Sequence, residues 1–199
     1  KEFTFPSTLK YVEDGILVGN DSLEQINYNA TRCEHREILS PGHGVIISCP
    51  SDFKINFAET VQYIPARFVS YCGITSVDIP GNIKVIGESA FGNNEYLETA
   101  ILHDGLERLD EGAFSYCPIK EFTFPSTLKH IGNSILYRDS ALERVTYNVK
   151  GQDVSREQNG KSVILSCPSD FEIKFDDEHK KGEIKITLKY KNNISSIEN

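Results

Sequence analysis

The sequence has no long apolar run and no excess of basic charge, and each absence disfavours a class of function. No stretch approaches the roughly 18 apolar residues that a membrane-spanning helix needs, so membrane insertion is not expected. Lysine and arginine number 21 against 29 aspartate and glutamate residues, giving a formal net charge of −8. This balance disfavours nucleic acid and anionic membrane as partners, because both attract basic surfaces.

Cysteine is also scarce. There are five, an odd number and too few for a disulfide scaffold: Cys33, Cys49, Cys72, Cys117 and Cys167. Cys72 and Cys117 both follow a tyrosine, and Cys49 and Cys167 lie in two copies of Ser-Cys-Pro-Ser-Asp. Cysteines that recur in register are typical of buried packing positions. We therefore expect structural thiols rather than redox, metal or disulfide roles.

No motif for catalysis, metal or phosphate binding stands out. Cys33-Glu34-His35, with His43 nearby, matches no zinc spacing, and the second copy of this segment has Gln152 and Asp153. His103-Asp104 and Asp110-Glu111 combine histidine with carboxylates, but nothing places a serine or cysteine nucleophile beside them. Glycine-rich phosphate loops are absent. We expect no enzyme activity, no metal and no cofactor.

Internal repeats dominate what the sequence does contain. Residues 1–10 and 120–129 both read KEFTFPSTLK, an offset of 119. VIISCPSDFKINF at 45–57 returns as VILSCPSDFEIKF at 163–175, an offset of 118. A block of about 119 residues has therefore been duplicated, and such repetition indicates a stacked-repeat architecture.

A shorter period lies inside the block. Units of 22–23 residues cover 3–25, 77–99, 100–121 and 122–144, a degenerate unit covers 55–76, and longer units of 28–29 residues cover 26–54 and 145–172. A unit this short cannot bury its own apolar face. Stacked units would share one core and pair their strands in parallel. The longer units predict a loop or β-hairpin on their outer side.

Each unit begins with alternating apolar and polar residues, as in Val77-Asp78-Ile79, which predicts a short strand with one buried face. Pro6, Pro80 and Pro125 end three of these strands. The segment from Ile86 to Phe91 has apolar spacing that suits one helical turn. These features predict an α/β repeat fold: a right-handed solenoid with a parallel concave sheet and short helical turns or loops on the convex side.

The expected domains are a solenoid over residues 1–176 and a terminal segment over 177–199. Residues 182–190 alternate and predict a strand that caps the solenoid, and residues 192–199 are expected to form a frayed tail. The first residue is Lys1, so we expect the chain to be a fragment of a longer protein.

The repeat unit resembles a known family. Its pattern is Leu97, Ala100, Leu102, Leu106, Leu109, Ala113, Phe114, Cys117 and Ile119, which looks like the BspA-like class of leucine-rich repeats. The resemblance covers most of residues 3–175. Units 3–25 and 122–144 depart from it, because Ile16-Leu17 and Ile135-Leu136 replace Ala-Phe. The resemblance implies binding and adhesion, as in surface and secreted proteins of host-associated bacteria and some protozoa.

A ligand would be expected on the concave sheet. There the outward residues of successive strands form two ladders, and neighbouring residues within a ladder are about 4.8 Å apart. The candidate ligand-binding residues are Lys54, Asn56, Ser76, Asp78, Thr99, Ile101, Glu121, Thr123, Arg144 and Thr146. Short polar side chains suit hydrogen bonding to a protein or glycan, with little entropy lost. Both ladders lack aromatic residues, which weakens a sugar-stacking role. The alternative is that these are ordinary solvated sheet residues.

Two functions remain open. The first is a cell-surface or secreted adhesion module, expected to be monomeric, that captures a protein or glycan ligand of host origin. The second is a structural or cytoplasmic scaffold repeat, in which free cysteines would be natural. The sequons at Asn20, Asn29 and Asn193 would matter only in a eukaryotic secretory host.

Overall fold

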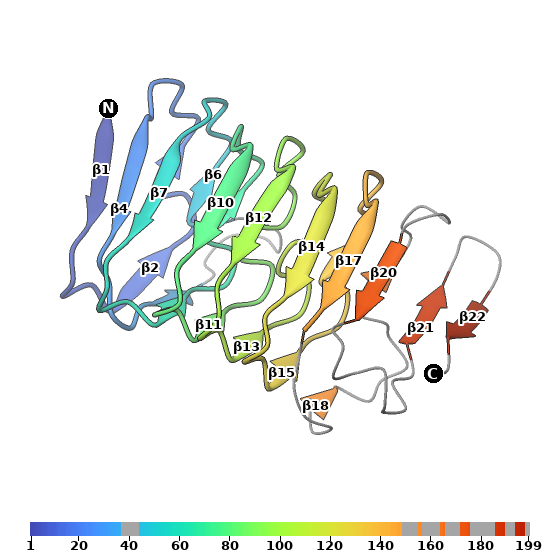
Figure 1. Cartoon of the computed structure of the whole chain (residues 1–199). Helices are drawn as coiled ribbons and strands as arrows, with labels where there is room; N and C mark the ends of the chain where they lie inside the picture. The colour runs from blue at the N-terminus through green and yellow to red at the C-terminus, as the bar shows by residue number, and fades with distance from the viewer. Residues whose placement is uncertain are drawn as a thin grey trace.

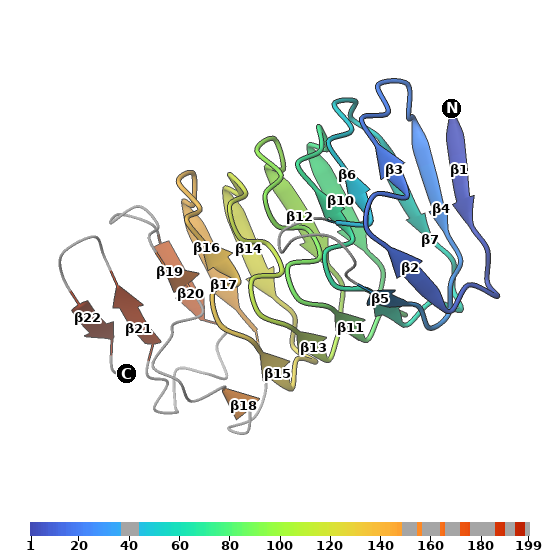
Figure 2. The same cartoon turned by 180° about the vertical axis from the view of Figure 1, so that it is seen from behind.

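The chain winds into a stack of coils with strands on three sides (Figures 1 and 2). The computed structural model describes residues 1–36 and 44–148, and the backbone of five later strands. In Figure 1 the chain descends each long strand at the front, returns behind and advances to the right, which is a right-handed coil. The predicted repeat solenoid is therefore what the chain forms.

The longest strands lie side by side along one side of the stack, which we call the long-strand sheet. They pair in parallel in two runs, β1-β4-β7 and β10-β12-β14-β17-β20. Their bounds are β1 Glu2–Phe5, β4 Gln25–Tyr28, β7 Lys54–Phe57, β10 Ser76–Ile79, β12 Thr99–Leu102, β14 Glu121–Phe124, β17 Arg144–Tyr147 and β20 Glu172–Phe175. This is the parallel sheet predicted from the alternating apolar and polar residues at the start of each unit.

Shorter strands line the other two sides. The second side carries β2 Tyr11–Glu13, β5 Glu34–Arg36, β8 Tyr63–Ile64, β11 Val85–Ile86, β13 Arg108–Leu109, β15 His130–Ile131 and β18 Ser155–Arg156. The third side carries β3 Leu17–Val18, β6 Ile46–Ile47, β9 Val69–Ser70, β16 Leu136–Tyr137 and β19 Ile164–Leu165. Neighbouring coils pair in parallel on these sides too.

The core fills the space between the three sides. In β10, β12 and β14 buried and exposed residues alternate, so every second side chain points inward. Phe68, Phe91 and Phe114 stack through the interior of successive coils, with ring centroids 6.3 and 5.4 Å apart. Each coil thus contributes one layer to a shared core, as a unit too short to bury its own face requires.

The helical turn predicted between Ile86 and Phe91 is wrong, and the described part of the chain contains no helix. The amides of Ser89, Phe91 and Asn93 donate instead to carbonyls of the next coil, at 2.8 to 2.9 Å. The alternate amides, of Ala90 and Gly92, donate within the turn to carbonyls three residues back. Three of these five amides, which a helix would use internally, therefore bind the neighbouring coil.

Two columns of left-handed residues make this turn. The first holds Gly15, Arg67, Ser89, Gly112 and Ser134; the second, four residues later in each coil, holds Gly19, Ser48, Tyr71, Asn93, Tyr116 and Arg138, all with φ between 50° and 69°. Such a conformation favours glycine and asparagine and costs other residues roughly 1–2 kcal/mol. The third side is therefore built from regularly repeated strained positions.

The long unit at 26–54 contributes β5 to the second side and β6 to the third, paired in parallel with β2 and β3. The loop or hairpin predicted for its outer side falls largely on residues 37–43, outside the described residues. In the other long unit, β18 and β19 pair in the same way with β15 and β16. Both units therefore keep the three-sided coil.

After the last coil, β21 Ile186–Lys189 lies within the predicted terminal strand. It pairs antiparallel with β22 Ile194–Ile197, which lies in the segment expected to be a frayed tail. The division into a solenoid over 1–176 and a cap over 177–199 stays a prediction. Within the described residues, no helix is long and apolar enough to span a membrane.

Candidate binding surface

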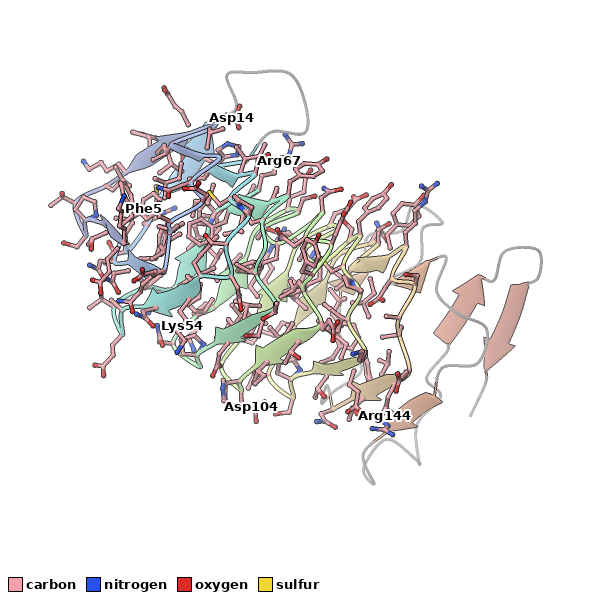
Figure 3. The ribbon with its side chains drawn as sticks, turned by 90° about the horizontal axis from the view of Figure 1, so that it is seen from above. Phe5, Asp14, Lys54, Arg67, Asp104 and Arg144 are labelled. Atoms are coloured by element: carbon pink, nitrogen blue, oxygen red, sulfur yellow. The ribbon has the colours of Figure 1, made fainter. Side chains whose placement is uncertain are left out.

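The ten candidate residues lie on the outward face of the long-strand sheet, in the two predicted ladders. Lys54 and Asn56 stand opposite Gln25 and Asn27, and Ser76 and Asp78 stand opposite Thr99 and Ile101. Thr99 is opposite Glu121, and Glu121 and Thr123 are opposite Arg144 and Thr146. All ten are exposed or half-buried. Figure 3 shows Lys54 and Arg144 along one side of the stack, with Asp14 and Arg67 along the opposite side.

Amide side chains link the ladders in the first coils. The Asn56 amide donates to Asn27 Oδ1 at 3.0 Å, and the Gln25 amide donates to the same oxygen at 2.9 Å. The Asn27 amide in turn reaches Thr4 Oγ1 at 3.5 Å. These bonds hold short polar groups in register with the strands, because the repeat places like residues one coil apart.

Ion pairs and a histidine–carboxylate contact continue the surface in the later coils. Arg144 pairs with Glu121, and His103 Nε2 lies 2.9 Å from Asp78 Oδ1. One residue before the ladder, Lys120 Nζ lies 2.5 Å from Glu98, whose carboxylate raises the pKa of the lysine. Exposed pairs of this kind contribute little stability, with a median of about 0–1 kcal/mol. Their charges are therefore available to a ligand at small cost to the fold.

The candidate surface does not coincide with either of two clefts found in the described part of the molecule. A cleft of about 310 Å³ lies between Ser7–Tyr11 and the segment with Thr31, Arg32 and Glu34. A cleft of about 250 Å³ lies on the third side, beside Tyr71 and Tyr116. The ten candidate residues are spread over five strands, β7, β10, β12, β14 and β17, and such an extended set suits a macromolecule better than a small ligand.

The histidine and carboxylate motifs take separate partners. His35 Nε2 lies 2.7 Å from Asp14 Oδ1, with both side chains buried, while Cys33 is buried in the core and His43 lies outside the described residues. Asp104 accepts hydrogen bonds from the amide and the hydroxyl of Ser126, both at 2.9 Å. No cluster of three histidine, cysteine or acidic side chains that could hold a metal occurs among the described residues.

Four cysteines, Cys33, Cys49, Cys72 and Cys117, are free and buried, and Cys167 lies outside the described side chains. Cys49, Cys72 and Cys117 follow the second left-handed column by one residue. Burial raises the pKa of the Cys117 thiol to about 12, and its Sγ lies 3.1 Å from the Phe91 carbonyl. At these three positions the thiol is a small packing group, as the recurrence in register predicts.

A surface that sequence reasoning missed lies on the third side. Tyr71 and Tyr116 are 50% and 40% exposed, and Arg138 lies over the rings of Tyr116 and Tyr137. The recurrent Tyr-Cys pairs at 71–72 and 116–117 carry the signal. The sequence alone does not show that these tyrosines point outward, because their direction depends on the left-handed turn.

Stacked coils of 22–29 residues with parallel strands and one shared core define a leucine-rich-repeat solenoid. Residues 47–143 match the BspA type leucine rich repeat region in six copies, and this part of the chain belongs to that family. This family indicates a repeat scaffold suited to protein interaction, and no catalytic family is indicated.

A solved structure supports the fold. The chain is similar to a leucine-rich repeat protein from Bacteroides ovatus, with 16% identity and a TM-score of 0.50. The match covers 96% of this chain and 62% of that protein, so the chain spans less than two thirds of its length. At this identity the likeness concerns the fold alone. No curated protein sequence matches the chain.

Proposed function

We propose that this chain is a binding module of a cell-surface or secreted protein, and that it captures a protein or glycan ligand on the outward face of the long-strand sheet. The observation that carries the proposal is the pair of in-register polar ladders. They run along the sheet as exposed short side chains and weak ion pairs. A ligand can replace such contacts without disturbing the core beneath them.

The ladders favour a large ligand that binds through many small contacts. Thr99, Thr123 and Thr146 lose little side-chain entropy on binding, while Asp78 and Arg144 add charges of opposite sign. The mixed charge favours a partner with a mixed polar surface, since complementary charges select the partner and fix its register. Low affinity per copy would be raised by repeated units in one protein.

A second function, an intracellular scaffold for protein assembly, is favoured by the buried free thiols. Cys49 and Cys72 lie in adjacent coils, with the Cys49 amide 3.4 Å from Cys72 Sγ. Reduced, closely placed thiols are natural in a reducing compartment. The scaffold would use the same outward face toward an intracellular partner.

A comparative pull-down tests the proposal. The chain is incubated with extracellular-matrix and host-cell extracts beside a variant in which Asn56, Asp78, Thr123 and Arg144 are changed to Ala. A matched control changes four exposed residues away from the ladders, Glu13, Thr31, Gln62 and Arg108, to Ala. Circular dichroism and urea unfolding establish that all three proteins are folded.

A matrix or cell-surface partner that binds the wild type and the control, and is lost by the ladder variant, supports the proposal. Equal capture by all three proteins would contradict the assignment to this face. Specific capture of intracellular partners alone would favour the scaffold.

A further inference from the structure

The second left-handed column places aromatic and basic side chains on the third side, away from the ladders. Its members in four successive coils are Tyr71, Asn93, Tyr116 and Arg138, with φ of 54°, 61°, 58° and 56°. Coils repeat about every 4.8 Å, so Tyr71 and Tyr116 stand about 10 Å apart with the shorter Asn93 between them. The cleft of about 250 Å³ lies at this place and is also lined by Glu95 and Ser140.

The backbone conformation at these positions does not favour tyrosine or arginine. A positive φ is uncommon for a bulky residue, whereas glycine and asparagine adopt it readily. Gly19 occupies the position equivalent to Arg138 in the first copy of the duplicated block, and Asn93 fills the same position in another coil. Tyrosine and arginine thus stand where glycine or asparagine would suit the turn better.

Burial in the core does not explain the two tyrosines either. Tyr71 is 50% exposed and Tyr116 is 40% exposed, so neither ring fills the core. The Tyr116 and Tyr137 rings meet edge to face, with centroids 5.2 Å apart. The Arg138 guanidinium lies 5.6 and 5.4 Å from these two ring centroids. Two cation–π contacts therefore orient the guanidinium at the edge of the cleft.

The two ring contacts position Arg138, and no described carboxylate pairs with it. Among the residues that the structure describes, no carboxylate lies within ion-pair distance of its guanidinium. A guanidinium that stacks on ring faces keeps its N–H groups in its own plane, where they can donate to a ligand. A planar fork of donors matches the two oxygens of a carboxylate, which it binds through paired hydrogen bonds.

We propose that this cleft binds a carboxylated sugar, such as a sialic or uronic acid residue at the end of a glycan. The carboxylate would pair with Arg138, and the apolar face of the ring would rest against the exposed tyrosines. Sugar hydroxyls would donate to Glu95 and exchange hydrogen bonds with Asn93 and Ser140. A cleft of about 250 Å³ takes one such ring, and it is smaller than the roughly 300–1,000 Å³ of sites for larger ligands.

The site goes beyond the proposed function, because it lies on a different side of the solenoid and needs none of the ladder residues. The two ideas can therefore fail separately. The ladder variant, in which Asn56, Asp78, Thr123 and Arg144 are Ala, should keep full sugar binding. A sugar that binds only when the ladders are intact would overturn the assignment to the cleft.

Saturation-transfer NMR titrations test the proposal with three probes: sialyllactose, methyl glucuronide and uncharged lactose. We expect at least one acidic probe to bind, and lactose to bind at least tenfold more weakly. Arg138→Gly copies Gly19, and Tyr116→Asn copies Asn93. Each should weaken acidic-sugar binding tenfold or more while leaving the urea midpoint unchanged or raised, because each relieves backbone strain.

A lower midpoint in both variants would overturn the proposal, since it would show that the side chains serve the fold. Arg138→Lys separates the two roles further: it keeps the charge and loses the planar fork, so it should weaken binding without lowering the midpoint. Equal binding of lactose and the acidic probes also overturns the proposal. The proposal is also overturned if neither acidic probe binds. This holds even if a protein partner is found whose binding depends on Tyr116.

Discussion

Asp139 is a buried carboxylate, and replacing it with asparagine should stabilise the protein above neutral pH. Its side chain is fully buried, Oδ1 accepts a hydrogen bond from the Ala141 amide at 3.1 Å, and Oδ2 has no hydrogen-bond partner. Burial raises the pKa of this carboxyl from 3.8 to about 7. The ionised form is therefore disfavoured in the folded protein.

The repeat supplies the replacement. Asn94 occupies the equivalent position in an earlier coil, where its amide donates to the carbonyls of Val69 and Phe91 at 3.0 and 2.8 Å. In Asp139→Asn the new amide should reach the equivalent carbonyls of Phe114 and Leu136. The variant thus keeps the acceptor for Ala141 and fills the unmet hydrogen-bonding position without a charge.

The pH dependence follows from the raised pKa. Between pH 4 and 7 the folded state holds the Asp139 proton more tightly than the unfolded state, so the wild type loses stability as pH rises through this range. With a folded pKa of about 7 against 3.8, the loss attributable to Asp139 is about 1 kcal/mol at pH 4.5 and about 4 kcal/mol at pH 8. The stability gained by Asp139→Asn should therefore be about 3 kcal/mol larger at pH 8 than at pH 4.5.

Urea unfolding at pH 4.5 and pH 8, followed by circular dichroism and tyrosine fluorescence, measures the difference. The chain has no tryptophan, so tyrosine is the intrinsic fluorophore. Asp21→Asn, an exposed change in the equivalent turn of the first block, controls for removal of one negative charge. A stability gain in Asp139→Asn that is the same at both pH values would refute the reasoning, because the pKa of Asp139 would then be the same in the folded and unfolded states.

Three further predictions concern the core and the turns. Phe91→Ala removes a ring stacked on Phe114, and it should lower the free energy of unfolding by about 3–5 kcal/mol in urea denaturation. Gly105→Ala places a Cβ 2.0 Å from a backbone oxygen at φ 116°, and it should cost well over 2 kcal/mol in the same assay. Gly19→Ala, with open space around its Cβ at φ 58°, should cost only about 1 kcal/mol, and equal losses for the two glycines would contradict the steric argument. The buried thiols of Cys49, Cys72 and Cys117 should react with a thiol reagent at the rate of unfolding, and fast reaction in native buffer would show that they are accessible.

The sequence predicts the long-strand sheet residue by residue because the signals that define it are local. Alternation in Val77-Asp78-Ile79 assigns each side chain to the inside or the outside, and the repeat then aligns one coil with the next. Asp78 opposite Ile101 and Thr123 opposite Thr146 follow from repeat spacing alone, and the structure pairs them so. Whether a ligand binds these ladders stays a prediction, because an outward polar side chain serves solubility as well as recognition.

The third side depends on tertiary structure. The spacing from Ile86 to Phe91 fits a helical turn and a left-handed turn equally well, since both bury the same apolar residues. The left-handed turn forms because it lets amides such as that of Phe91 bind a carbonyl of the next coil. No single unit contains this contact. That choice turns Tyr71, Tyr116 and Arg138 outward and buries Asp139 beside them. The sequence by itself therefore determines the repeat, the register and the ladders, whereas the stacking of coils decides the turn, the aromatic cleft and the buried carboxyl.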